Sequence, residues 1–426
     1  MKYPQATKAE LCFLHTQLRE QFEKIKAEGL QLDLSRGKPS AEQLELSMPM
    51  LSHSRLSAKD CISESGVDCR NYGLGFGIPE MRRLWSDLTG IPADRIIVGG
   101  NSSLNLMYDS VARAMLYGVY GSARPWFREE KIRFLCPSPG YDRHFAICES
   151  LGIEMITVPL GKDGPDMDMV ERIAGEDASV KGIWCVPKYA NPTGITYSDE
   201  VVRRLATMKT AAPDFRIYWD NAYMIHDLYE TGDKLLDIFA EAEKAGNEDR
   251  IMFYTSSSKI TFPGAGVSIM AMSRHNMEQI GPIWNVQTIG HDKLNQLRHL
   301  EFLPDKAAVL SLMKRHAAIL GRRFRIAEDI LKEDLGGLAI AEWTEPRGGY
   351  FISLDVYPGT AGRVYELCRE AGVTLTKVGA TFPYGKDPED KNLRIAPSYP
   401  SEEDLAEAMR VLTLAVRLAA LEKLIG

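Results

Sequence analysis

One lysine stands in surroundings that suit either an ordinary surface charge or a reactive centre. Lys259 follows three serines and the apolar segment 251–255, and small residues come after it. No basic residue lies between Lys259 and Arg274. Most lysines are surface charges, but a buried lysine loses its proton readily and then acts as a nucleophile. The residues elsewhere in the chain that could work with an amine therefore decide between the two interpretations.

Two further motifs place polar residues directly after apolar segments. Asn191 opens the sequence Asn-Pro-Thr-Gly, which is typical of a tight turn. Asp220 follows the apolar segment 217–219, and Tyr223 comes three residues later. A carboxylate in that position is partly buried and needs a cation or a hydrogen-bond donor as its partner. Taken singly, a turn and a structural salt bridge are the ordinary explanations of these motifs.

Two more stretches have side chains that suit a flat, phosphorylated ligand. Residues 98–103, Val-Gly-Gly-Asn-Ser-Ser, lie between a predicted strand and a predicted helix, where free amides and hydroxyls can bind phosphate. Tyr141 follows another predicted strand, where its ring could stack on a planar group. Taken singly, a helix cap explains the first stretch, and a core position explains the tyrosine.

The elements that must position these residues alternate along the chain. Short apolar, β-branched segments are separated by helical patterns, which predicts an α/β domain with a largely parallel sheet over residues 50–300. Several segments are apolar throughout, as expected for strands buried on both faces. In such sheets, binding groups gather beyond the carboxyl ends of the strands. The predicted strands are 95–100, 132–141, 153–160, 182–187, 215–223, 250–257 and 267–273.

The chain after residue 300 has a different pattern. A long amphipathic segment, 307–335, predicts a helix, and shorter apolar segments precede a final helix that opens at Ser401. The basic residues of the long helix are expected on a solvated face; they are Lys314, Arg315, Arg322 and Arg323.

The N-terminal residues are expected to join this C-terminal part. Apolar residues at helical spacing predict a first helix that ends at Gly29 and needs a partner for its apolar stripe. We therefore predict two domains: a large one, 50–300, and a smaller α+β one formed by 1–49 and 301–426.

Composition narrows the classes of protein that remain. The chain has 426 residues, a net charge of −7 and 45% hydrophobic residues, which is ordinary for a globular protein with a large core. The charge gives no general attraction to nucleic acid or anionic membranes, and no apolar run is long enough to span a bilayer. The N-terminus lacks a secretory signal pattern, and seven scattered cysteines without a CxxC pair argue against disulfides and zinc. We expect a cytoplasmic protein without a metal, a nucleic-acid partner or a membrane partner.

In combination, the motifs are more informative than they are singly. Asn-Pro-Thr-Gly, then Asp-x-x-Tyr, then Ser-x-x-Lys, each beyond a strand end, resemble the fold-type I pyridoxal-phosphate (PLP) aminotransferases of class I/II. The resemblance extends to 34–39 (Leu-Ser-Arg-Gly-Lys-Pro), 72–83 and 392–397 (Asn-Leu-Arg-Ile-Ala-Pro), and it spans roughly residues 32–400. It implies that 50–300 is a PLP-binding large domain with a mostly parallel sheet flanked by helices.

The resemblance implies a role for each candidate residue around the cofactor. Lys259 forms the Schiff base with PLP and moves the proton at the substrate α-carbon, while Asp220 keeps the ring nitrogen protonated. Asn191 and Tyr223 hydrogen-bond the phenolic oxygen, and Tyr141 stacks on the ring. The residues that match the phosphate site are Asn101, Ser102, Ser103, Ser256 and, from the neighbouring subunit, Tyr72.

The resemblance also implies substrate contacts and shows one departure. Arg394 matches the arginine that binds the substrate α-carboxylate, which suits a planar bidentate donor, and Gly37 and Asn191 match its neighbours. The family usually carries a phosphate-binding arginine shortly after the lysine, but here Gly266 lies nearest that place. The chain is similar to a divergent branch with MocR-type proteins and a third subgroup of aspartate aminotransferases. Only about 30 residues precede the first motif, so the DNA-binding domain of MocR regulators is not expected.

The resemblance thus predicts an aminotransferase that moves an amino group from an L-amino acid to a 2-oxoacid such as 2-oxoglutarate by ping-pong chemistry. Aspartate or glutamate is the favoured donor, and a homodimer with shared active sites is expected. The alternatives are an aromatic or 2-aminoadipate aminotransferase or a β-lyase on the same scaffold, and a non-catalytic PLP-binding effector module. The cations considered for a distal substrate carboxylate are Arg36, Lys38 and Arg143.

Overall fold

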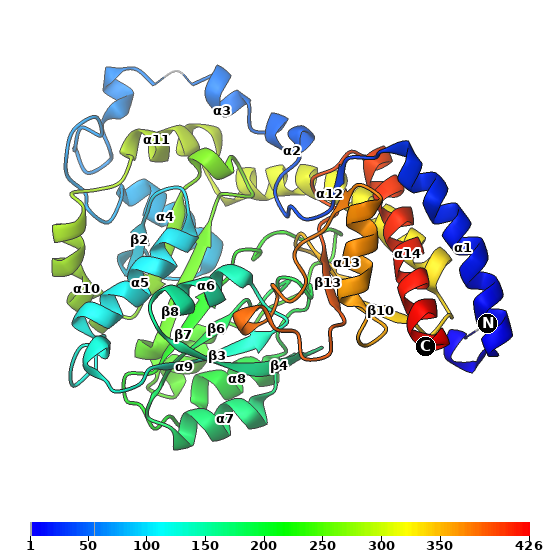
Figure 1. The fold of residues 1–426 in the computed structure, drawn as a ribbon. Helices are drawn as coiled ribbons and strands as arrows, with labels where there is room; N and C mark the ends of the chain where they lie inside the picture. Colours follow the sequence, from blue (N-terminus) through cyan, green and yellow to red (C-terminus); the bar gives the residue numbers. More distant parts are fainter. Residues whose placement is uncertain (1, 55) are drawn as a thin grey trace.

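The computed structural model describes residues 2–54 and 56–426. Figure 1 shows two groups of elements: a large sheet with helices around it, and beside it a group that contains the first and last helices of the chain. These groups have separate hydrophobic cores. Within the described residues, no helix is long and apolar enough to cross a membrane.

The large sheet is built from eight of the described strands. Its order is β2-β9-β8-β7-β6-β3-β4-β5, and the neighbours from β8 to β4 run parallel, whereas β9 is antiparallel to β2 and β8. The predicted α/β fold with a mostly parallel sheet is confirmed. The strands are β2 (Ile96–Val98), β3 (Arg133–Ser138), β4 (Glu154–Gly161), β5 (Gly164–Pro165), β6 (Val180–Cys185), β7 (Arg216–Asp220), β8 (Ile251–Ser256) and β9 (Ser268–Met272).

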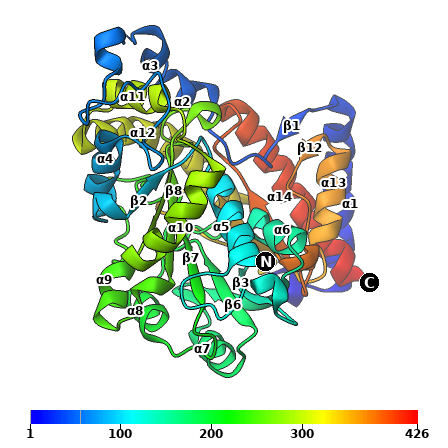
Figure 2. The ribbon, with the colours of Figure 1, turned by 90° about the vertical axis from the view of Figure 1, so that its left-hand side faces the viewer.

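Helices cover both faces of this sheet (Figures 1 and 2). Successive residues of a strand point to opposite faces, so Tyr218 packs with one helix layer and Trp219 with the other. The layer on the Tyr218 side contains α5 (Ser103–Tyr117), α6 (Asp142–Ser150) and α10 (Arg274–Gln287). The opposite layer contains α4 (Pro79–Thr89), α7 (Met167–Glu176), α8 (Asp199–Thr207), α9 (Ile238–Lys244) and α11 (Lys293–Phe302).

The second group of elements surrounds a core of its own. An antiparallel sheet is formed in the order β10-β11-β13, and β1 pairs with β12 in parallel. The first helix has a Thr7–Glu10 capping box, ends at Gly29 and packs against the last helix, as its apolar stripe requires. The elements are α1 (Lys8–Glu28), β1 (Leu32–Asp33), β10 (Ala341–Trp343), β11 (Ile352–Val356), α13 (Ala361–Glu370), β12 (Val373–Thr374), β13 (Asn392–Ile395) and α14 (Glu402–Ile425).

One long helix, α12 (Lys306–Leu335), belongs to both cores. Val309 packs into the core on the large sheet, and Phe324 packs into the core of the second group. Lys314 and Arg315 are exposed as predicted, but the prediction was wrong for Arg323, which is buried. Its guanidinium donates to Ser40 Oγ and to the Ser398 carbonyl, because the chain segments around these two serines cross α12 there. Ser40 directly precedes the short helix α2 (Ala41–Glu45), which is followed by α3 (Pro49–Ser52).

The parallel strands bring the candidate residues to one edge of the sheet. Because β3, β6, β7 and β8 share a direction, their carboxyl ends meet at the same side. Tyr141 follows β3, Asn191 follows β6, Asp220 ends β7 with Tyr223 beyond it, and Lys259 follows β8. The fold therefore converts residues far apart in the sequence into one cluster.

A buried histidine on α12 ties this edge to the N-terminal segment. His316 Nδ1 accepts a hydrogen bond from Gln43 Nε2 at 3.0 Å, and its Nε2 donates to the carbonyl of Ile260, also at 3.0 Å. Burial lowers the pKa of His316 to about 4. The ring is therefore neutral in the folded protein over most of the pH range in which a free histidine is charged.

We predict that His316→Gln weakens the pH dependence of stability. Unfolded histidine takes up a proton near its ordinary pKa of about 6.5, whereas folded His316 stays neutral until the pH approaches 4. The free energy of unfolding therefore falls as pH falls through this window, by up to about 3 kcal/mol from this residue. Urea unfolding midpoints at neutral and acidic pH should fall less in the variant than in the wild type. An equal fall in both proteins would contradict the prediction.

Candidate active site

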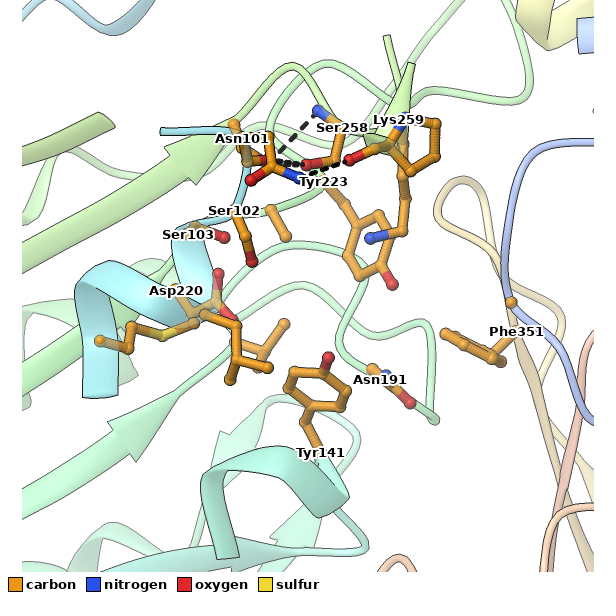
Figure 3. Close-up of a pocket in the computed structure, with 17 residues that line it drawn as sticks. Asn101, Ser102, Ser103, Tyr141, Asn191, Asp220, Tyr223, Ser258, Lys259 and Phe351 are labelled. Atoms are coloured by element: carbon orange, nitrogen blue, oxygen red, sulfur yellow. Dashed lines mark hydrogen bonds between the residues drawn. The ribbon is translucent and has the colours of Figure 1, made fainter. Parts of the chain in front are cut away.

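A cavity of about 310 Å³ lies at the carboxyl edge of the large sheet (Figure 3). Ten residues singled out in the sequence line it: Gly37, Asn101, Ser102, Ser103, Tyr141, Asn191, Asp220, Tyr223, Ser256 and Lys259. The sequence reasoning missed the other lining residues, which are Leu104, Met107, Val186, Ala222, Ser258, Pro263 and Phe351. Most of these are apolar and carry no chemical signature, so only a three-dimensional structure could assign them to the cavity.

Lys259 lies in the turn after β8, and its amine points into the cavity beside Tyr223 (Figure 3). Its Nζ is 4.9 Å from the centre of the Tyr223 ring and 5.9 Å from that of Tyr350. Burial lowers the pKa of Lys259, and the negative charge of Asp220 partly opposes this effect. A larger fraction of the amine is therefore neutral, and thus nucleophilic, than at the surface.

Asp220 is a buried carboxylate in which one oxygen lacks a hydrogen-bond donor from the described chain. The residue is 3% exposed, and its Oδ2 lies 3.0 Å from His144 Nε2. Within the described chain, its Oδ1 is buried and has no hydrogen-bond partner. Buried polar atoms are nearly always hydrogen-bonded, so this oxygen suits a donor from a ligand in the cavity.

His144 is a functional neighbour that the sequence reasoning did not identify. Its ring stacks on Trp184 at 4.3 Å between centroids, which holds Nε2 against Asp220. A signal was present in the sequence, because His144 comes three residues after Tyr141, at the start of α6. Tyr141 is the N-cap residue of α6 and His144 lies in its first turn, and their rings are in edge contact with centroids 5.0 Å apart.

Hydroxyls and amides gather at the N-terminus of α5. Ser258 Oγ donates to the carbonyl of Asn101 at 3.0 Å, and Asn101 Nδ2 donates to the carbonyl of Pro263 at 3.2 Å. Ser256 Oγ donates to Ser258 Oγ, and Ser102 and Ser103 also line the cavity here (Figure 3). The free amides and the dipole of a helix start bind anions, so this end of the cavity suits a phosphate.

The anion end has few positive charges of its own. Among the described residues that line the cavity, Lys259 is the one cation. Gly266, at the place where the family usually has an arginine, is closely packed: a Cβ there would lie 3.2 Å from the Phe262 carbonyl oxygen and the Ser258 nitrogen. A larger residue at this position would require its neighbours to move.

Arg394 lies on β13 just outside the lining residues, and it contacts two of them. Its Nη1 donates to Asn191 Oδ1 at 3.3 Å and to Asp142 Oδ1 at 2.8 Å. The guanidinium carbon is 4.9 Å from the centre of the Phe351 ring. Because Arg394 engages the oxygen of Asn191, the amide nitrogen of Asn191 remains as its donor.

Gly37 approaches the same ring very closely. A Cβ at Gly37 would lie 2.0 Å from Phe351 Cζ, so no other residue fits there without displacing the ring.

Tyr223 is buried, and this burial raises the pKa of its hydroxyl well above the ordinary value. The hydroxyl therefore stays protonated and can donate a hydrogen bond.

Tyr72 is a predicted cofactor-binding residue that does not line the cavity of its own chain. Its side chain is 78% exposed, on a loop whose next residues pack against the loop after α10.

Of the cations considered for a distal carboxylate, Arg36 pairs with Asp33, and Lys38 lies over the Tyr399 ring at 4.1 Å. Arg143 is exposed on α6, close enough for its charge to act on the pKa of Tyr141.

We predict that Asp220→Asn lowers the pKa of Lys259 further. The carboxylate is the charge that favours the protonated amine, so its removal leaves the effect of burial unopposed. An NMR titration of the lysine amine in the cofactor-free protein measures the change. Asp227→Asn is the control, since that carboxylate pairs with Lys188 at 3.0 Å and should leave the Lys259 pKa unchanged. A Lys259 pKa that stays constant or rises in Asp220→Asn would disprove the coupling.

Comparison with known proteins supports the same interpretation. The family model for aspartate amino-transferase matches residues 6–426. An aspartate aminotransferase of Corynebacterium glutamicum is 46% identical over 409 residues, which cover 96% of this chain and 94% of that protein.

Solved structures agree with the sequence comparison. An aspartate transaminase from Corynebacterium glutamicum has a TM-score of 0.97 at 43% identity, covering 100% of this chain and 99% of that one. An α-aminoadipate aminotransferase from Thermus thermophilus shares the fold, with a TM-score of 0.72 at 20% identity and coverage of 99% and 97%. The predicted family is thereby confirmed: the chain belongs to the aspartate aminotransferase family and is a transaminase.

Proposed function

We propose that this transaminase uses PLP to transfer the amino group of L-aspartate or L-glutamate to a 2-oxoacid such as 2-oxoglutarate. The observation that carries the proposal is a single cavity lined by both Lys259 and Asp220, in which Asp220 Oδ1 has no partner from the described chain. The donor is proposed because a 46% identical relative is an aspartate aminotransferase.

The lining residues fit PLP in three respects. Asp220 Oδ1 lacks the donor that a protonated pyridine nitrogen would supply. The start of α5, with Ser102 and Ser103, offers amides and hydroxyls to a phosphate, and the Tyr141 ring suits stacking on a flat heterocycle. When bound, PLP supplies a conjugated ring that withdraws electrons from the substrate α-carbon.

Lys259 is the proposed base of the reaction. Its amine would hold PLP and, once the substrate amine replaces it, would be the base that takes the proton from the substrate α-carbon and passes it on. The lowered pKa leaves more of the amine free to accept that proton at neutral pH. Tyr223 and the Asn191 amide would donate to the phenolic oxygen of PLP, and the raised pKa of Tyr223 keeps its donor proton in place.

Arg394 and the phosphate end complete the proposed binding site. The nearly buried guanidinium of Arg394 binds the substrate α-carboxylate, which turns the α-carbon towards Lys259. The phosphate relies on amides, on the hydroxyls of Ser102 and Ser256, and on Tyr72 of the partner subunit, in place of the usual arginine. Arg143 is the proposed contact for a distal carboxylate, since Arg36 and Lys38 are engaged elsewhere.

A cytoplasmic homodimer is part of the proposal. Tyr72, Val286 and Ile289 are 78%, 90% and 59% exposed, although Tyr72 and Ile289 lie on loops that pack together. Exposed apolar side chains grouped in this way favour an interface.

The described cysteines are all free, which agrees with a reducing compartment. The cores support, in the main, the proposed division into a large domain, 50–300, and a small domain, 1–49 with 301–426, although residues 303–313 pack with the large sheet and Tyr189 and Tyr223 pack with the second core.

The function is tested with a panel of amino acids, 2-oxoglutarate and a measurement of the glutamate formed. Aspartate should be the best donor for the wild type. Lys259→Ala should lose at least about a thousandfold in rate, because it removes both the cofactor anchor and the base. Borohydride should fix PLP to the wild type and not to the variant.

The control for this test is Lys314→Ala, which removes an exposed lysine of α12 and should leave activity and labelling unchanged. Labelling that persists in Lys259→Ala would show that another lysine anchors PLP. Absence of transfer with every donor would refute the substrate proposal.

The shared active site is tested by complementation. Tyr72→Ala should weaken PLP binding by roughly tenfold or more, because one hydroxyl donor to the phosphate is lost. At a PLP concentration too low to load Tyr72→Ala, mixing this protein with inactive Lys259→Ala under conditions of subunit exchange should restore activity, since one site of each mixed dimer then has both residues. Activity that remains absent, with dimers present by sedimentation, would show that Tyr72 does not act across an interface.

A further inference from the structure

The residue roles proposed for the site do not explain one ion pair there. Arg394 Nη1 donates to Asp142 Oδ1 at 2.8 Å, and the side chains are 10% and 32% exposed, respectively. Asp142 is the first residue of α6 and directly follows Tyr141. A carboxylate of the protein therefore occupies part of the guanidinium that is proposed to bind the substrate carboxylate.

The other contacts of Arg394 do not offer a comparable charge. Asn191 Oδ1 and the Phe351 ring are neutral, and Asp142 is the single anion paired with Arg394 in the described chain. The guanidinium still has donor capacity, because its buried Nε has no partner there. A substrate carboxylate that arrives at this guanidinium meets the negative charge of Asp142 beside it.

The two carboxylates at the site, Asp220 and Asp142, differ in how freely their side chains can move. Asp220 is enclosed and held by His144, whereas a third of the Asp142 side chain reaches solvent. Asp142 can therefore turn from Arg394 towards water at low cost, while its position in the first turn of α6 favours its charge. Exchange of one carboxylate for another on Arg394 needs no rearrangement of the backbone.

We propose that Asp142 competes with the substrate α-carboxylate for Arg394 and thereby sets the affinity of the enzyme for its amino acids and 2-oxoacids. The inference rests on the proposed role of Arg394. Because substrate and product both carry an α-carboxylate, the competition weakens the binding of both. Asp142 thus raises KM and speeds the release of product, without a part in the proton transfer.

The test is Asp142→Asn in the enzyme loaded with PLP. Asparagine keeps the size of the side chain and an accepting oxygen but removes the charge. The dissociation constant of succinate, a dicarboxylate that cannot react, should fall roughly tenfold by calorimetry, in line with the strength of charge-assisted bonds. KM for aspartate and for 2-oxoglutarate should fall together, while kcat changes less.

Asp199→Asn is the matched control. Asp199 is also the first residue of its helix, α8, and pairs with an arginine, Arg203, at 3.2 Å, but it lies away from the cavity. Its removal should leave the succinate constant unchanged. Asp142→Ser provides a second variant if Asp142→Asn does not fold, because serine is well tolerated at a helix start.

The outcomes separate the inference from the function on which it rests. A succinate constant that is unchanged or higher in Asp142→Asn overturns the inference, and a higher value would mean that Asp142 orients Arg394 instead. Arg394→Ala should weaken succinate binding strongly. If it does not, the proposed carboxylate role of Arg394 fails; if it does while Asp142→Asn has no effect, only the competition fails.

Discussion

A charged group enclosed by an apolar sheet is the constraint on which the site depends. Asp220 ends a fully buried strand, and its described partner is His144, which Trp184 holds by stacking. A carboxylate in such a place costs several kcal/mol unless donors surround it. One oxygen of Asp220 has no donor in the described chain, so this position favours a ligand that carries an N–H group. In the proposed function, the protonated ring nitrogen of PLP would supply this N–H, and the protonated ring would withdraw electrons from the substrate.

The site also depends on how the two cores meet. Lys259 and Asp220 come from the large sheet, whereas Arg394 and Phe351 belong to the second group of elements. Helix α12 contributes to both cores and so helps to fix the distance between Arg394 and Lys259, the residues proposed to bind the substrate and to move its proton. Small displacements between such groups reduce catalysis strongly, because proximity supplies a large part of the rate.

Local sequence patterns and the family resemblance were sufficient for the fold and for most lining residues, because most of these lie at or just beyond the end of a predicted strand, and parallel strands bring those ends together. They were insufficient where contacts join distant segments. Nothing near Arg323 indicates that it is buried against Ser40, and the pair Asp142–Arg394 spans 252 positions of sequence. Phe351 is an ordinary apolar residue until Gly37 is brought against it. Tyr72 shows the limit of a single chain, since its exposed ring has a proposed role only beside a second copy.

The packing of the first helix on the last has a consequence for synthesis of the chain. The apolar residues Leu11, Leu18 and Phe22 of α1 share a core with α14, which begins at Glu402. A ribosome must make residues 29–401 before that covering helix emerges, at roughly 5–20 residues per second. The earliest helix is thus exposed for longer than any other part of its core. Nascent chains would therefore offer this stripe to chaperones until α14 covers it.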